Sequence, residues 1–234
     1  MKKKIVVFGG SGFLGKYFCE EILNNNSIGN LNILNSCVKN KVKKIFFASS
    51  LYSFSDQGSF YKCSKQSSEI YLMEFKKLYD LDYVILRYGT VYGEGCSDKN
   101  GIYKILKKLI INKKLHYEGN KNTERSYIHV KDVAKITVKI MTQNVKNCVF
   151  LIKGNKNIKI LKLLDQIKKI MGLKSKISFG KNILNAHYLK YPNKFVEPKK
   201  ILKIINLIID NNLNLVGTLS RIYFSVLFLL LKYI

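Results

Sequence analysis

The amino-acid sequence predicts an α/β fold with a doubly wound parallel sheet, and two stretches of the chain support this prediction. Lys2–Phe8 is a short strand rich in Val and Ile, followed at once by a glycine-rich turn and a helical stretch over Leu14–Asn24. Ile45–Ala48 is a short apolar run with aromatic residues, which is typical of a strand buried on both faces. Because helices cover both faces of a parallel sheet, these stretches favour the α/β class.

The glycine-rich turn at residues 9–15, GGSGFLG, has the strand–turn–helix context that a dinucleotide fingerprint requires. Gly9 permits the tight turn, Gly12 lets the backbone approach a pyrophosphate, and Gly15 allows close packing of helix against strand. The helix N-terminus then offers free N–H groups to phosphates. The spacing is GxxGxxG rather than GxGxxG, and a purely structural turn is the alternative.

A serine pair and a Tyr-x-x-x-Lys motif form the candidate catalytic group. Ser49 and Ser50 end the second strand, where the carboxyl ends of parallel strands face the ligand crevice. Tyr61 and Lys65 follow within a predicted helix over Phe60–Leu78, and their i, i+4 spacing puts both side chains on one helix face. A cation beside a phenol favours the phenolate, which can act as a base. A chance pairing on a helix rich in Lys and Tyr is the alternative.

Five segments in this order resemble the extended short-chain dehydrogenases/reductases, the NAD-dependent epimerase/dehydratase enzymes of nucleotide-sugar metabolism. They are GGSGFLG, the serine pair, Tyr61 with Lys65, RYGTVYGEG at 87–95, and EGN followed by TERSYIHVKDVA between 118 and 134. The resemblance covers residues 1–172, and the remainder more weakly. It implies a Rossmann-like sheet with a small C-terminal substrate region.

The resemblance also implies a cofactor, NAD or NADP, and the residues that hold it. The pyrophosphate would be bound by the glycine turn, namely Gly9, Ser11, Gly12, Phe13, Leu14 and Gly15. Lys65 would hold the nicotinamide ribose as well as serving in the catalytic set with Ser50 and Tyr61.

A nucleotide sugar is the substrate that the resemblance implies. Ser50 and Thr90 match positions that contact the sugar, and Arg125 matches the arginine that clamps the diphosphate, which suits its planar fork. No acid follows Ser50 at Leu51 or Tyr52, so elimination is disfavoured and epimerase or reductase chemistry is favoured.

The chain departs from the family between its first helix and the serine strand. Only residues 16–48 separate Gly15 from Ser49, whereas the family needs about two further βαβ units of roughly 30 residues each. No Asp or Glu lies between Glu21 and Asp56 to hold the adenosine ribose. The sequence therefore predicts a shortened sheet, and leaves open either a compact enzyme or a truncated pseudoenzyme with weak or no cofactor binding.

Charge and cysteine usage narrow the class of protein. The net charge is +26, but only three of the 41 basic residues are arginine and the lysines are scattered, so no specific nucleic-acid partner is predicted. Five cysteines without a CxxC pair, and no opening signal peptide, indicate a reduced cytoplasmic protein. Scattered His and Cys residues predict no metal site.

Beyond Ala134 the pattern predicts a helix to Met141, a strand over Cys148–Ile152 and an amphipathic helix over Asn157–Met171. We expect an NAD(P)-binding domain over residues 1–155 and a substrate region over 156–234. The apolar Leu215–Ile234 segment is best explained as a docked helix, with weak association with a membrane surface as the alternative. A homodimer is left open.

Overall fold

The computed structural model describes residues 5–8, 29–55, 59–96, 100–112, 115–174 and 176–180. These residues belong to two compact units built from interleaved segments. Among the described residues, the first unit takes the chain up to Tyr88 together with Lys135–Ile152, and the second takes Gly89–Ala134 and the chain from Lys153 to residue 180. The glycine-rich turn, the helix predicted after it and the apolar C-terminal segment lie outside the described residues. The boundary placed after residue 155 stays a prediction.

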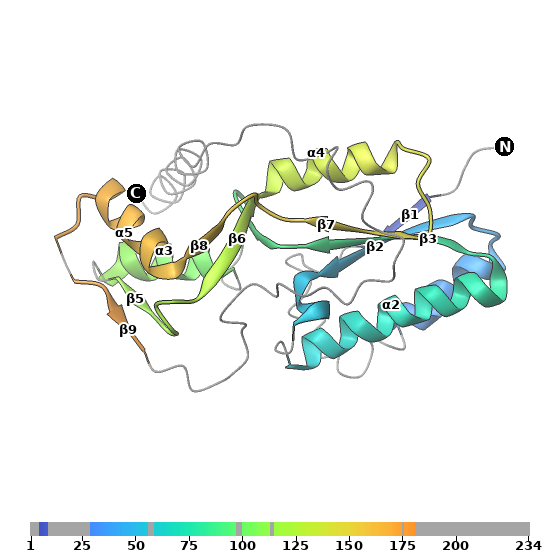
Figure 1. The fold of residues 1–234 in the computed structure, drawn as a ribbon, viewed down its shortest axis with the longest axis horizontal. Coiled ribbons are helices and arrows are strands. Elements are labelled where there is room, and N and C mark those ends of the chain that lie inside the picture. Colours follow the sequence, from blue (N-terminus) through green and yellow to red (C-terminus); the bar gives the residue numbers. More distant parts are fainter. Residues whose placement is uncertain are drawn as a thin grey trace. The chain divides into compact units, whose positions relative to one another are not determined.

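A four-stranded parallel sheet forms the centre of the first unit (Figure 1). Its strands, in spatial order, are β1 (Ile5–Phe8), β2 (Lys44–Ser50), β3 (Asp82–Tyr88) and β7 (Cys148–Ile152). Residues 45–50 of β2 are all buried, because β2 has a neighbour on each side and the sheet is covered. The parallel α/β sheet and the strands predicted around Phe8, Phe46 and Phe150 are confirmed.

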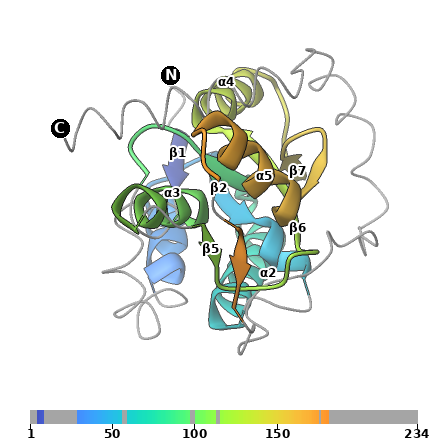
Figure 2. The ribbon, with the colours of Figure 1, turned by 90° about the vertical axis from the view of Figure 1, so that its left-hand side faces the viewer.

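Helices lie on both faces of this sheet, as the doubly wound prediction requires. Residues 29–39 are helical, and with α2 (Ser59–Tyr79) they pack on one face through a core that includes Leu34, Leu72 and Phe75. The part of α4 (Val130–Met141) that belongs to this unit lies on the opposite face (Figures 1 and 2). There the Tyr88 hydroxyl is 3.0 Å from Thr137 Oγ1.

The position of β1 in the sheet is relevant to the prediction of a shortened sheet. β1 pairs directly with β2, with Phe8 opposite Phe47. In the usual doubly wound order, 3-2-1-4-5-6, the first strand also has a neighbour on its other side. Among the strands that the structure describes, the sheet begins at β1, which is compatible with the shortened sheet expected from the sequence.

The second unit is built around short strands and two helices. Its elements are β4 (Thr90–Tyr92), α3 (Gly101–Asn112), β5 (His116–Tyr117), β6 (Glu124–His129), β8 (Asn157–Lys159), α5 (Ile160–Ile170) and β9 (Ser178–Phe179). Apolar residues of α3 and α5, among them Leu109 and Leu164, form its core.

The helix predicted from Asn157 begins three residues late. Asn157–Lys159 is instead the strand β8, which pairs antiparallel with β6. The Ile160 amide then donates to the Thr123 carbonyl at 2.8 Å, where α5 starts. The apolar period of α5 predicted the helix correctly, but strand pairing with a distant segment decided its first residue.

The described residues include no helix long and apolar enough to cross a membrane. Four of the cysteines fall in this part of the chain, and all four are free thiols: Cys37, Cys63, Cys96 and Cys148.

Thiol reactivity should follow burial. Burial raises the pKa of Cys148 to about 11 and also raises that of Cys37, whereas Cys63 is exposed on α2. Because the thiolate is the nucleophile, an alkylating agent at mildly alkaline pH should modify Cys63 much faster than Cys37 or Cys148 in the folded protein. Peptide mass mapping over time measures this order. Equal rates for Cys63 and Cys148 would contradict the packing of β7.

Candidate functional site

The serine pair lies at the carboxyl edge of the parallel sheet in the first unit. Ser49 and Ser50 are the last residues of β2, and a 3₁₀ turn, η1 (Leu51–Phe54), follows directly. Ser50 caps this turn, since its Oγ accepts a hydrogen bond from the Tyr52 amide at 3.3 Å. Its hydroxyl therefore lies where a strand gives way to a loop, which is where ligands bind in α/β sheets.

Tyr61 and Lys65 share a face of α2, as their spacing predicted. Lys65 Nζ lies 5.8 Å from the centroid of the Tyr61 ring. The Lys65 side chain is buried, with 7% of the residue exposed, and Nζ donates to the Ala48 carbonyl at 3.0 Å. Ala48 precedes the serine pair in β2, so the lysine fixes the start of α2 against the strand that carries Ser50. The first unit thus contains all three residues of the expected catalytic set.

A buried ion pair that the sequence analysis missed holds the serine strand in place. Arg87 Nε donates to Glu69 Oε1 at 3.0 Å and to Oε2 at 3.2 Å, and Arg87 Nη2 also donates to Oε2. Ser49 Oγ donates to the same carboxylate. Ser49 and Arg87 are register partners on the adjacent strands β2 and β3, so one carboxylate from α2 receives donors from both.

The Glu69–Arg87 pair also reaches the turn after Ser50. The Arg87 guanidinium stacks on the Phe54 ring, 3.2 Å from its centroid. Glu69 is 4% exposed and Arg87 8%, so the charges are removed from water and stabilised by several hydrogen bonds. The pair joins α2, β2, β3 and η1, the four elements around Ser50. The sequence offered one indication of this pair: Glu69 lies four residues after Lys65, and so on the same face of α2.

Thr90 and Arg125 lie in the second unit, on adjacent strands. β4 and β6 pair in parallel with Thr90 opposite Tyr127, and Arg125 is two residues from Tyr127 on the same face of β6. Arg125 is buried, and its Nη1 donates to the Glu124 carbonyl at 2.8 Å. Two of the three residues expected to contact the nucleotide sugar thus lie on adjacent strands of the second unit, whereas the third, Ser50, belongs to the first unit.

The expected pyrophosphate-binding residues, 9 and 11–15, lie beyond the part of the chain that the structure describes. The glycine-rich run follows Phe8, which pairs in register with Phe47 of β2. Because β1 and β2 are parallel, the carboxyl end of β1 lies at the sheet edge that also carries the serine pair.

Breaking the buried pair should destabilise the fold strongly. Glu69→Gln leaves the Arg87 charge buried without its counter-ion, and we expect a loss of about 3–5 kcal/mol in the free energy of unfolding. Urea denaturation followed by circular dichroism measures it. Glu74→Gln, which removes an exposed carboxylate paired with exposed Lys77 on the same helix, should cost at most about 0.5 kcal/mol.

A double variant tests whether the loss of stability comes from the unpaired charge. Replacing both partners, Glu69→Leu with Arg87→Leu, removes both charges and should recover much of the lost stability. Equal stability of Glu69→Gln and Glu74→Gln would contradict the buried pair.

A family model and the curated relatives of this chain point to the same family. The model of the "NAD dependent epimerase/dehydratase family" matches residues 20–152. A curated relative from Methanocaldococcus jannaschii, named "Putative UDP-glucose 4-epimerase", is 28% identical over 215 residues, which span 80% of this chain and 70% of the relative. Two further curated relatives are covered over 52% and 60% of their own lengths.

Solved structures of both epimerases and dehydratases share the fold of this chain. The UDP-glucuronic acid 4-epimerase from Bacillus cereus, in complex with UDP-glucuronic acid and NAD, superposes with a TM-score of 0.72 at 22% identity, over 88% of this chain and 68% of the enzyme. The dTDP-glucose 4,6-dehydratase from Bacillus anthracis gives 0.68 at 19% identity, over 79% and 62%. These likenesses establish a Rossmann-like fold without distinguishing the two reactions. From its strand order and the family match over more than half its length, the chain belongs to the NAD-dependent epimerase/dehydratase family.

Proposed function

We propose that the chain is an NAD- or NADP-dependent epimerase or reductase that acts on a nucleotide-activated sugar, with Ser50, Tyr61 and Lys65 as its catalytic set. The observation that carries the proposal is the position of the Lys65 ammonium, beside the Tyr61 ring and anchored to β2 directly before the serine pair. A fixed cation near a phenol favours its deprotonation, which a proton-abstracting tyrosine needs. The names of the relatives, two of them UDP-sugar 4-epimerases, support the substrate class.

The end of β1 and the sequence that follows it support a dinucleotide site at this edge of the sheet. The carboxyl ends of β1 and β2 lie at one sheet edge, and the glycine-rich run follows β1 directly. We assign the pyrophosphate to Gly9, Gly12 and Gly15 and the nicotinamide ribose to Lys65, whose ammonium can donate to ribose hydroxyls. When bound, the nicotinamide supplies a hydride acceptor.

The proposed chemistry begins with proton abstraction from a sugar hydroxyl. Tyr61 takes this proton while the Ser50 hydroxyl hydrogen-bonds to the same sugar oxygen. Loss of hydride from the carbon that bears this oxygen, to a bound nicotinamide, would leave a carbonyl. In an epimerase the hydride would return to the opposite face of that carbon, and Tyr61 would return the proton. Elimination is not proposed, because neither Leu51 nor Tyr52, the two residues after Ser50, is a carboxylic acid that could protonate a leaving hydroxide.

Recognition of the nucleotide sugar is assigned to the second unit. Arg125 and Thr90 lie on adjacent strands there, and a guanidinium binds diphosphate oxygens through two parallel hydrogen bonds. We propose Arg125 for the diphosphate, and Thr90 for a sugar hydroxyl.

A second candidate, a truncated pseudoenzyme with weak or no cofactor binding, follows from the sheet. Among the described strands none lies beyond β1, where the adenosine half of the cofactor would need a neighbouring strand and an acid. Cofactor binding distinguishes the two candidates.

NADH should bind in the micromolar range. Titration of the purified chain with NADH, followed by nicotinamide fluorescence, is uncomplicated by tryptophan, because the chain has none. Gly12→Asp should weaken binding, since a carboxylate there repels the pyrophosphate, whereas Tyr61→Phe should leave it unchanged. No saturable binding of NADH or NADPH up to millimolar concentration would support the pseudoenzyme instead.

Turnover should depend on the Tyr61 hydroxyl. Tyr61→Phe removes the proton acceptor, and we expect kcat with a UDP-sugar substrate to fall by about 10²–10⁴ with cofactor binding retained. Tyr79→Phe, the same change at an exposed tyrosine of the same helix, is the matched control and should keep full activity. Equal activity of the two variants would remove Tyr61 from the mechanism.

A further inference from the structure

Tyr52, to which neither the family match nor the sequence analysis assigns a role, contacts both Ser50 and Tyr61. Its backbone amide donates to Ser50 Oγ, and its ring lies 6.0 Å, centroid to centroid, from the Tyr61 ring with an interplanar angle of 78°. We propose that Tyr52 is a positioning residue, whose ring fixes the orientation of the Tyr61 phenol toward the substrate. The inference rests on the function proposed above.

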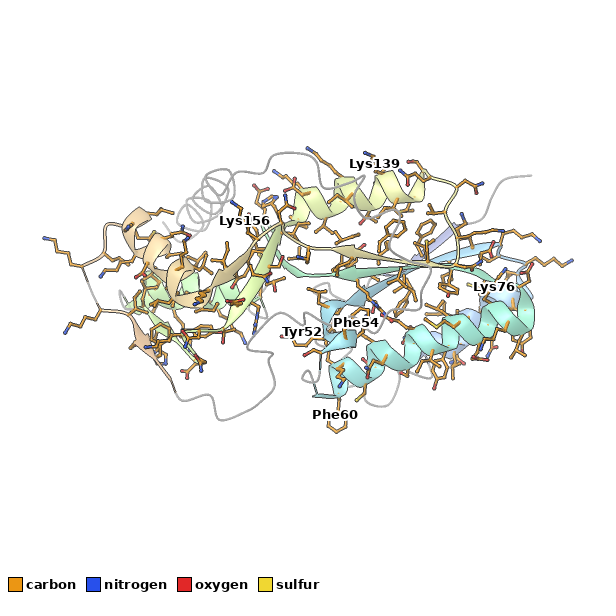
Figure 3. All side chains as sticks on the ribbon, viewed as in Figure 1. Tyr52, Phe54, Phe60, Lys76, Lys139 and Lys156 are labelled. Atoms are coloured by element: carbon orange, nitrogen blue, oxygen red, sulfur yellow. The ribbon has the colours of Figure 1, made fainter. Side chains whose placement is uncertain are left out.

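The backbone of Tyr52 is itself held in place. η1 begins at the Ser50 cap, and two residues after Tyr52 the Phe54 ring stacks on the buried Arg87 guanidinium. Figure 3 shows Tyr52 and Phe54 on this turn, next to the N-terminal end of α2. The Tyr52 ring therefore extends from a turn that is anchored on both sides of it.

Tyr61 needs such support because of its place in α2. The helix starts at Ser59, so Tyr61 lies in the first turn, where backbone N–H groups lack partners within the helix. Its side chain is only partly buried, and two χ angles set the direction of its hydroxyl. An edge-to-face contact of two aromatic rings favours the packed rotamer by about two- to tenfold. Lys65 lies near the same ring, so the contact also keeps the phenol close to the cation.

The contact with Tyr61 is made by the ring of Tyr52, so two substitutions of Tyr52 should differ in their effect. Tyr52→Phe keeps the ring and should behave as the parent chain. Tyr52→Leu removes it and should lower kcat about two- to tenfold, with KM for the cofactor unchanged. The ring signals of Tyr61 in the NMR spectrum, assigned by their loss in Tyr61→Phe, should shift in Tyr52→Leu and stay in place in Tyr52→Phe.

Phe60→Leu is the matched control for a lost aromatic ring. Phe60 precedes Tyr61 on α2, is 69% exposed and projects away from the sheet (Figure 3). This variant should keep both the parent kcat and the Tyr61 ring signals.

Four results would overturn the inference. Unchanged kcat and Tyr61 signals in Tyr52→Leu would show that the ring does not position the phenol. A kcat in Tyr52→Phe as low as in Tyr52→Leu would assign the effect to the hydroxyl. Should Tyr52→Leu fail to fold, a lowered kcat or shifted Tyr61 signals in Tyr52→Phe would overturn it. Failure of the parent chain to bind cofactor or turn over any sugar nucleotide would overturn the proposed function and this inference together, whereas the first three results leave that function standing.

Discussion

The buried Glu69–Arg87 ion pair is the interaction on which the candidate site depends. One carboxylate on α2 receives donors from the ends of two adjacent strands, Arg87 on β3 and Ser49 on β2. The guanidinium then packs on Phe54 of the turn after Ser50. An ion pair removed from water is stable only when its hydrogen bonds are complete, so these elements have little freedom to shift independently. The pair thereby fixes the strand end, the turn and the helix relative to one another.

The residues proposed for catalysis occupy a small part of this arrangement. Lys65 lies one helical turn before Glu69 and binds the Ala48 carbonyl, so α2 is attached to β2 at two successive turns. Tyr61, one turn earlier still, lies near the helix start, beyond these two anchors, and meets Tyr52 instead. Lys65 is thus held by a hydrogen bond to β2, whereas Tyr61 is held at the helix start by its ring contact with Tyr52.

Much of the fold could be predicted from local pattern, and the exceptions have a common cause. The buried strand around Phe46, the helix carrying Tyr61 and the strand over Cys148–Ile152 follow from apolar runs and periodicity, which are local properties. The late start of α5 was missed because β8 exists only through pairing with β6. Glu69 and Tyr52 were missed for the same reason. The partner of Glu69 is Arg87, 18 residues away on β3, and the partner of Tyr52 is Tyr61 on the following helix.

By itself the sequence determined the class of fold, the family and the identity of the candidate catalytic residues. Glycine spacing, strand composition and the i, i+4 placement of Tyr61 and Lys65 are local features of the sequence. They determine local structure through short-range sterics and the helical period. Only the tertiary structure decided which charges are buried together and which aromatic rings meet, because these depend on contacts between segments brought together by the sheet. The Glu69–Arg87 pair arises in this way, because a charge removed from water needs a counter-ion from another segment, and the Tyr52–Tyr61 contact arises because η1 packs beside the start of α2.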